Sequence, residues 1–136
     1  MKKKKELGGN LGLRVYLASP LSAKTQAGIT ANMELAVKKL LICQAVFKQH
    51  KFVAPHTWLP KFLDDNNPEE RAFALECGQR ILGFCDAILL CGPRISSGME
   101  AELRAAVRAG KEAYAEDQLY DAAAKMEADE KNRMEG

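Results

Sequence analysis

The stretch Asp86-Ala-Ile-Leu-Leu-Cys-Gly-Pro-Arg-Ile-Ser-Ser-Gly-Met-Glu-Ala-Glu-Leu-Arg-Ala-Ala106 joins an apolar run, a turn and the start of an amphipathic segment. The run that ends at Leu90 is nearly all apolar, which is typical of a strand in the centre of a parallel sheet. The Gly, Pro and Ser residues after it indicate a turn. The segment from Ser97 has helical spacing and stops at Gly110, a good helix-ending residue. The stretch therefore predicts a strand, a turn and a helix in succession.

The same alternation runs through the rest of the chain. Short apolar runs predict strands, and apolar residues that recur at helical spacing predict helices. The predicted strands are 14–18, 52–55, 86–90 and 111–115, and the predicted helices are 29–50, 68–83, 97–110 and 118–131. The pattern predicts an α/β fold: a single-domain open parallel sheet with helices on both faces, flavodoxin-like or Rossmann-like. The first strand is expected to be central.

Two predicted helices begin with capping residues. Pro68 suits the first helical position, with Asn67 as the N-cap and Glu70 at the capping-box position. Ser97 and Glu100 have the spacing of a second capping box. A structural role therefore accounts for Glu100.

Length and composition indicate one globular domain of 136 residues, 47% hydrophobic and 28% charged, with a net charge of +2. Much of the basic excess lies in the run from Lys2 to Lys5. We interpret 1–12 as a disordered or tag-like basic start, 13–131 as the domain and 132–136 as a frayed end. No other basic stripe with aromatic residues and no membrane-length apolar run is visible, so neither nucleic acid nor a membrane is an expected partner.

The cysteines and acidic turns do not suggest cofactor chemistry. No two cysteines form a Cys-X-X-Cys pair, and all four lie in or next to apolar runs: Cys43, Cys77, Cys85 and Cys91. We interpret them as reduced thiols of a cytoplasmic protein. Asp64 and Asp65 have no third ligand at useful spacing and are expected to form a solvated turn. The sequence therefore predicts no metal site and no cofactor.

Glu102 borders the apolar stripe of the helix after the third strand and has small neighbours, Ala105 and Ala106, at helical spacing. Ligands of open α/β sheets bind where strands end and helices begin, and helix-start N–H groups favour anions. Glu102 is therefore a candidate catalytic group. The alternative is a surface glutamate at the edge of a helix.

Segment 96–106 resembles the nucleophile segment of the nucleoside 2-deoxyribosyltransferase-like superfamily. In that segment a small-residue loop leads to Glu-Leu, with an Ala four residues after the Glu. Glu102, Leu103 and Ala106 match this frame. Glu100 does not, because an arginine stands four residues after it.

Two further regions carry the resemblance. Val15-Tyr-Leu-Ala-Ser-Pro-Leu-Ser22 is similar to the first-strand loop of the superfamily. Three short segments resemble a little-characterised branch of it: Pro55-His56, 60–65 and 68–71. The resemblance covers roughly 14–115, and the order and spacing of the motifs carry more weight than each motif alone.

The resemblance implies that Glu102 attacks the anomeric carbon of a nucleoside or nucleotide. As in retaining glycosidases, a carboxylate would stabilise an oxocarbenium-like centre and trap it as a glycosyl-enzyme. A second base would then take the sugar, giving transfer, or water would take it, giving hydrolysis. Relatives often complete their sites across a subunit interface, so a homo-oligomer, a dimer or larger, is expected, with the Ala-rich third helix as a candidate contact.

The chain departs from the superfamily's pattern at two positions. Ser96 stands six residues before the candidate nucleophile, where the transferases usually have Asp, and Gly78 stands where another Asp is common. The related deoxynucleotide N-hydrolases carry a Ser at the first position, where it helps to hold a 5′-phosphate. Ser96, Ser97 and the N–H groups of Gly98 and Met99 would suit a phosphate. The departures favour a nucleotide substrate.

Other candidate binding residues follow the first and second strands. His56 could donate a proton to a leaving base or bind phosphate, and Trp58 could stack on a base. The alternatives are a loop histidine bonded to the backbone and a tryptophan that covers the edge of the core. Ser19, next to Pro20, either binds sugar or phosphate or simply ends a strand.

The function expected from the sequence is cleavage of the N-glycosidic bond of a nucleoside or nucleotide, by hydrolysis or deoxyribosyl transfer. The alternatives are a non-catalytic binding protein for a nucleotide-like ligand and an interaction module with a vestigial site. If the fold is doubly wound, Ser19, His56, Ser96, Gly98 and Glu102 should converge on one pocket.

Overall fold

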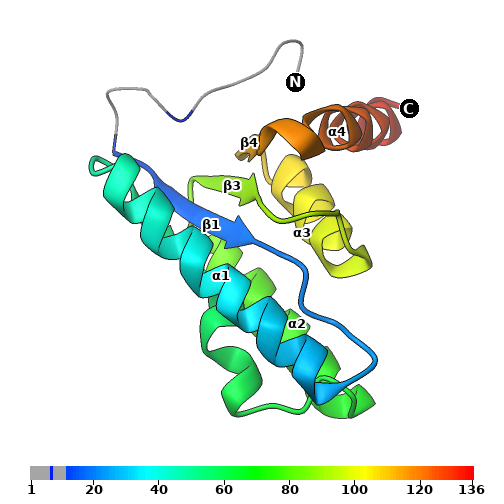
Figure 1. Ribbon diagram of the computed structural model, residues 1–136. Coiled ribbons are helices and arrows are strands. Elements are labelled where there is room, and N and C mark those ends of the chain that lie inside the picture. Colours follow the sequence, from blue (N-terminus) through cyan, green and yellow to red (C-terminus); the bar gives the residue numbers. More distant parts are fainter. Residues whose placement is uncertain (1–6, 8–11) are drawn as a thin grey trace.

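The computed structural model, which describes Leu7 and residues 12–136, contains a parallel sheet with helices around it (Figure 1). The strands are β1 (Arg14–Ala18), β2 (Lys51–Val53), β3 (Ala87–Leu90) and β4 (Glu112–Ala115). The helices are α1 (Gln26–Val46), α2 (Pro68–Gly83), α3 (Ser97–Arg108) and α4 (Tyr120–Glu135). Short 3-10 turns are η1 (Pro55–Thr57), η2 (Leu59–Lys61) and η3 (Asp117–Leu119).

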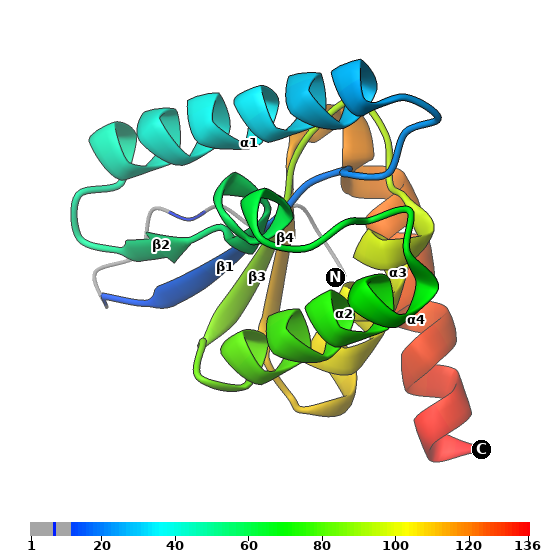
Figure 2. The same cartoon turned by 90° about the horizontal axis from the view of Figure 1, so that it is seen from below.

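The sheet has the order β2-β1-β3-β4 with every neighbouring pair parallel. Helix α1 covers one face, and α2, α3 and α4 lie on the other (Figure 2). The predicted α/β fold with helices on both faces is therefore confirmed, as is the interior position of the first strand. The carboxyl ends of β1, β2 and β3 share one edge, because parallel strands run in the same direction.

Alternation along β1 builds two cores. Val15 and Leu17 pack toward α1, whereas Tyr16 and Ala18 pack toward α3. All of β3 is buried, which explains why this strand is a continuous apolar run.

Helix α1 differs from the predicted helix at 29–50. It starts at Gln26, because Thr25 accepts a hydrogen bond from the Gly28 amide and caps it, and it ends at Val46. The apolar residues whose helical spacing predicted this helix do not form one buried face. Val37 and Leu41 are 40% and 64% exposed.

Helix α2 has the predicted bounds, and its N-cap is confirmed. The Asn67 side chain accepts from the amides of Glu69 and Glu70. The Glu70 carboxylate accepts a hydrogen bond from the Asp64 amide. Pro68 begins the helix without a missing bond, since the first amide of a helix has no partner inside it.

The predicted cap of α3 is wrong by one residue. Ser96, not Ser97, has the extended backbone of an N-cap and accepts from the Met99 amide at 3.2 Å. The Ser96 amide in turn bonds the Met99 sulfur. Glu100 therefore takes no part in a capping box; it pairs with Arg104 at 2.8 Å.

Helix α4 continues to Glu135, so the predicted frayed segment 132–136 is largely helical. Ion pairs with Glu130, which involve Arg104 and Arg108 of α3 and Arg133, hold this end of the helix. Helix α3 packs against α4 of the same chain. The candidate subunit contact on α3 therefore faces an intramolecular neighbour.

Of the predicted basic start, only Leu7 and Gly12 are described, and the prediction for the other residues lies outside the described part of the chain. Leu7 is 6% exposed and packs in the core next to β1. Its carbonyl accepts a hydrogen bond from the Nε2 of His50 at 2.9 Å. Leu7 is therefore part of the packed core.

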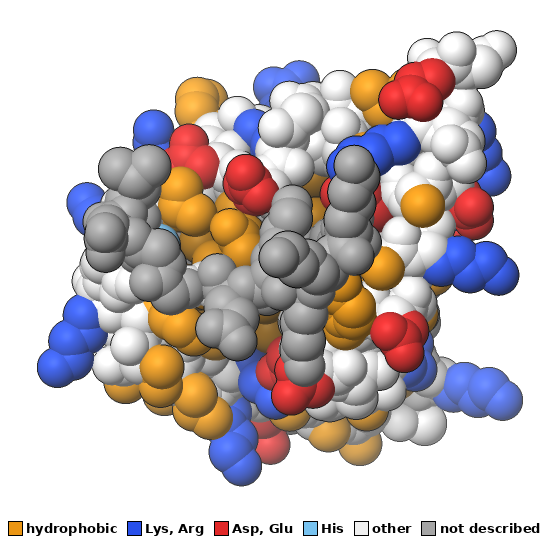
Figure 3. Space-filling model, turned by 90° about the horizontal axis from the view of Figure 1, so that it is seen from above, with side chains coloured by type: hydrophobic (Ala, Val, Ile, Leu, Met, Phe, Trp, Pro, Cys, Tyr) orange, Lys and Arg blue, Asp and Glu red, His pale blue; other side chains and the backbone are white. Residues whose placement is uncertain are grey.

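The distribution of basic side chains, the length of the helices and the state of the cysteines bear on the expected partners and on the thiols. On the face in Figure 3, Lys and Arg side chains are scattered around the edge and form no single patch. None of the helices in the described residues is long and apolar enough to cross a membrane. All four cysteines are free, and three of them are buried.

Candidate active site

Glu102 lies in the second turn of α3 at the edge where the strands end, and it is only 5% exposed. Its side chain meets Tyr16 of β1, which is 2% exposed and whose hydroxyl donates a hydrogen bond to the carboxylate. The alternative of a surface glutamate is therefore wrong. The alternation of β1 places Tyr16 on the face that α3 covers, so strand and helix together create the pair.

Burial raises the pKa of Glu102 to about 7, and the Tyr16 hydrogen bond opposes part of that rise. Burial also raises the pKa of Tyr16, which stays a neutral donor. In the described residues no ion pair involves Glu102. A carboxylate with this environment exchanges protons near neutral pH, as catalytic carboxyl groups often do.

Gly78 of α2 packs directly against this pair. A Cβ at this position would lie 2.9 Å from the Tyr16 hydroxyl and 3.9 Å from Glu102 Oε2. A side chain here would have to displace the tyrosine. There is thus no room at position 78 for the Asp that is common in the resembling superfamily. This steric reason could not be found from the sequence.

Two adjoining cavities open beside Glu102. The inner one has about 40 Å³ of room and mainly aliphatic walls, with Tyr16 and Gly78 at the carboxylate and three charged side chains at one side, Asp65, Glu70 and Arg71; the aliphatic residues are Leu21, Pro55, Leu59, Pro60, Leu63, Ala74 and Leu75. The outer one has about 120 Å³ and mixed walls, in which Leu21 and Leu75 lie beside a larger set of polar or small residues: Ser22, Asp65, Arg71, Arg94, Ser96, Ser97 and Gly98. Glu102 and His56 line both cavities.

His56 faces the cavities with a fixed ring. Its Nδ1 donates to the Ser19 carbonyl at 2.7 Å, so its Nε2 carries the lone pair of a neutral imidazole. Burial lowers the pKa of His56. At neutral pH the group is therefore a proton acceptor, which makes it a poor donor to a leaving base.

The structure brings four of the five expected pocket residues together: His56, Ser96, Gly98 and Glu102 all line the outer cavity. Ser19 lies beneath them, fully buried. Its carbonyl holds the histidine, and its hydroxyl has no hydrogen-bond partner among the described residues.

Of the other candidates, Ser97 also lines the outer cavity, whereas three lie elsewhere. Pro20 is buried and packs close to Gly92, at the turn after β3. Met99 is in the core, and its amide is already bonded to the cap. Trp58 is 42% exposed and lines neither cavity.

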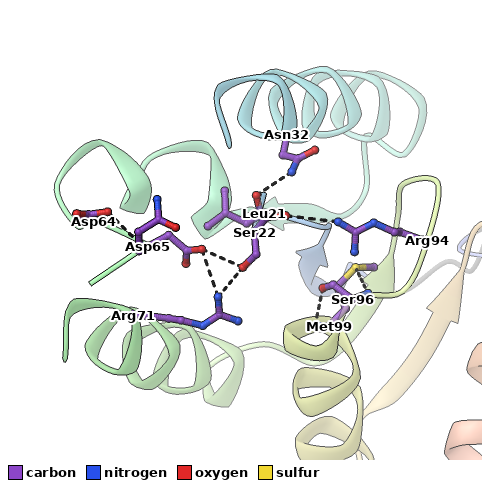
Figure 4. A network of polar contacts seen from close by, with 10 residues as sticks. Leu21, Ser22, Asn32, Asp64, Asp65, Arg71, Arg94, Ser96 and Met99 are labelled. Carbon is purple, nitrogen blue, oxygen red and sulfur yellow. Dashed lines mark hydrogen bonds and ion pairs between the residues drawn. The ribbon is translucent and has the colours of Figure 1, made fainter. Parts of the chain in front are cut away.

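A polar network beside the outer cavity was not foreseen (Figure 4). Arg71 Nη1 donates to Ser22 Oγ at 2.7 Å and pairs with Asp65 at 3.4 Å. The Ser22 hydroxyl donates to Asp65 Oδ2 at 2.9 Å. Asp65 therefore forms part of the cavity wall and is held there by Ser22 and Arg71. The prediction that it lies in a solvated turn was wrong. Both Asp65 and Arg71 fall in the segments that carried the resemblance, which was the one signal available.

Comparison with known protein families assigns the chain to one of them. Residues 13–115 match the family described as "Domain of unknown function (DUF7768)". The chain belongs to this family. The match covers the whole sheet and the cavities of the DUF7768 domain, but the description assigns no activity to it. Comparison with the curated proteins found no match.

A solved structure shares the fold of this DUF7768 protein. It is a 2-deoxyribosyltransferase from the psychrotolerant bacterium Bacillus psychrosaccharolyticus, with a TM-score of 0.55 and 18% sequence identity. The likeness covers 75% of this chain and 70% of that chain. At this identity it shows that the two proteins have a common α/β fold.

Proposed function

We propose that this protein cleaves the N-glycosidic bond of a nucleoside or nucleotide, with Glu102 as the nucleophile. The observation that carries the proposal is a buried carboxylate, bonded only by Tyr16 among the described residues, at the wall of a cavity where the strands end. The fold shared with a 2-deoxyribosyltransferase supports the same chemistry.

In the first step a Glu102 oxygen forms a bond to C1′, and the C1′–N bond breaks. The electron pair of the C1′–N bond leaves with the base, and the base then takes a proton from solvent. The negative carboxylate stabilises the positive charge that develops at C1′. The Tyr16 hydroxyl, as a neutral donor, orients the attacking oxygen. The inner cavity has apolar walls suited to the flat face of a base.

In the second step an acceptor attacks C1′ and releases the carboxylate. With water the product is a free sugar, and with a second base it is a new nucleoside. His56 supports the water reaction, because its Nε2 can accept the proton that water loses on attack. We therefore favour hydrolysis over transfer.

The test is incubation of the purified protein with a panel of nucleosides and nucleoside 5′-monophosphates, followed by chromatography of released bases. Addition of a second free base detects transfer. Release of a base is the expected result. Stabilisation by a nucleotide in thermal melts without release of any base would identify a binding protein and overturn the proposal.

We also propose a homo-oligomer whose contact lies on α1 in place of α3. Helix α1 exposes four large apolar side chains, Val37, Leu41, Ile42 and Val46, of which Leu41 and Val46 are each 64% exposed. Isolated apolar residues are common on surfaces, but four of them exposed on the second half of one helix are typical of an interface. A monomer in light scattering at micromolar concentration would contradict this proposal.

A further inference from the structure

We propose that Glu116 is a positioning residue, whose carboxylate holds Gly92 and thereby fixes the loop that leads from β3 into α3. Glu116 follows β4 and lines neither cavity, so it acts on the site only through this loop. The inference rests on the proposed function, because it names a residue that the reaction at Glu102 needs but that does not touch the substrate.

Gly92 is the first residue beyond the hydrogen-bond ladder of β3. The Cys91 amide still donates to the Ala18 carbonyl of β1 at 2.9 Å. The Gly92 amide donates instead to Glu116 Oε2 at 3.1 Å, and the Gly92 carbonyl accepts from the Gln118 side chain at 3.2 Å. Both the amide and the carbonyl of this loop residue are therefore held by side chains that follow β4.

The Glu116 side chain is itself held in place. The Glu116 amide donates to the Leu90 carbonyl at 3.0 Å, which continues the ladder between β3 and β4. Its other carboxylate oxygen, Oε1, pairs with Lys39 Nζ of α1 at 2.7 Å, and the Glu116 side chain is 21% exposed. An amide bonds a carboxylate more strongly than it bonds a neutral acceptor. The carboxylate therefore connects α1, on one face of the sheet, to the loop that begins α3 on the other.

The position of Gly92 matters because two loops of the site meet there. Gly92 has a φ of 108°, and a Cβ at this position would lie 2.7 Å from Pro20 Cδ, so only glycine fits. Pro20 follows Ser19, whose carbonyl accepts from His56 Nδ1 at 2.7 Å. A shift of Gly92 would therefore disturb the loop that holds the histidine.

In the other direction, Gly92 leads into the residues that begin α3. Arg94 reaches the Ser22 carbonyl at 3.5 Å, and Ser96 caps the helix through the Met99 amide (Figure 4). Glu102 lies in the second turn after this cap. Misplacement of a reacting group by about 1 Å can lower a rate by about a hundredfold. Loss of the Glu116 contact should therefore lower turnover, although Glu116 lies outside both cavities.

The test compares two substitutions at position 116. The substrate is the member of the nucleoside and 5′-monophosphate panel that the wild type cleaves fastest. Glu116→Ala removes the acceptor of the Gly92 amide, so kcat should fall by about tenfold to a hundredfold, with a smaller change in KM. Glu116→Gln keeps an oxygen that can accept from this amide and loses only the ion pair with Lys39. Its kcat should stay within about threefold of the wild type, because partly exposed ion pairs contribute little.

Glu130→Gln is the matched control for stability. It weakens the ion pairs between α3 and α4 and leaves the contacts of Gly92 intact. This variant should melt below the wild type and keep its kcat. Three results would overturn the positioning role: a wild-type kcat in Glu116→Ala, equal losses in the two variants at position 116, or a matching fall of kcat in Glu130→Gln.

Hydrogen exchange followed by NMR separates this inference from the proposed function. The Gly92 amide should exchange at least about tenfold faster in Glu116→Ala than in the wild type, whereas Glu116→Gln should keep most of the protection. If this pattern holds and the wild type releases no base from any member of the panel, the proposed function fails and Glu116 still positions the loop. Equal exchange in the wild type and Glu116→Ala would overturn the inference whatever the activity.

Discussion

Glu102 on α3 and Glu130 on α4 are both buried carboxylates on helices that pack together, but their surroundings differ. Glu130 is 1% exposed and pairs with Arg104 at 3.2 Å, with Arg108 and with Arg133. Arg108 and Arg104 lower its pKa. Among the described residues Glu102 has only a tyrosine for a partner, and burial raises its pKa to about 7.

The difference separates a carboxylate that stabilises the fold from one that is poised for chemistry. The charge of Glu130 is matched by its neighbours, so it favours the folded state when ionised. The charge of Glu102 is poorly compensated, so ionisation of Glu102 costs stability and leaves a reactive anion beside a cavity. The four predictions below test this contrast, from the largest expected effect to the smallest.

The largest effect is on activity. Glu102→Gln should reduce release of the base by about a thousandfold or more, because the amide keeps the shape but cannot supply an anionic nucleophile. Single-turnover chromatography of the base measures the loss. Glu100→Gln is the matched control, two residues before Glu102 on the same helix. This variant weakens the ion pair with Arg104, which contributes little because the Glu100 side chain is 40% exposed. Equal losses in both variants would identify the wrong carboxylate.

The second effect is on stability and depends on pH. The folded-state pKa of Glu102 is raised from 4.5 to about 7, so the folded protein binds this proton more tightly and loses stability as pH rises through that range. Glu102→Gln removes this pH-dependent loss of stability, because the amide does not ionise. At about pH 8 the variant should be more stable than the wild type by up to about 3 kcal/mol in urea unfolding, and at about pH 4 the two should be nearly equal. A variant less stable at the higher pH would refute the assignment.

Tyr16→Phe tests the one partner that Glu102 has in the described part of the chain. Loss of the donor removes a bond that favours the ionised form, so the pKa of Glu102 should rise further. The limb of kcat/KM near pH 7 should move to higher pH by about one unit. Rate measurements across the pH range follow this shift. An unmoved limb, with the fold intact, would mean that another group titrates.

Glu130→Gln should have the smallest effect, in the opposite direction. The pKa of Glu130 is lowered in the folded state, so its contribution is present at neutral pH and is lost as pH falls through that lowered value. The variant should melt modestly below the wild type at pH 7, and the gap should close in acid once pH falls below that lowered value. Activity should stay unchanged. A gap that persists in acid would show that packing, not charge, accounts for it.

The sequence by itself determined the order of elements and several boundaries. Pro68 after Asn67 fixed the start of α2, because a capping side chain and a preset φ act within a few residues. The unbroken apolar run of β3 likewise marked an interior strand. Local signals were less reliable for α1, where exposed apolar side chains blurred the pattern, and at Ser96, where two adjacent serines could each begin α3.

The sequence also selected Glu102 by its resemblance, but only the tertiary structure decided how that carboxylate behaves. Its pKa is raised by burial, which arises when α2 and α3 pack on the sheet, and the hydrogen bond from Tyr16, distant in sequence, opposes part of that rise. The pairing of Arg71 with Ser22 depends on the same packing. Caps and strands follow from interactions between near neighbours in the chain. Desolvation and long-range hydrogen bonds depend on which distant residues the fold brings together.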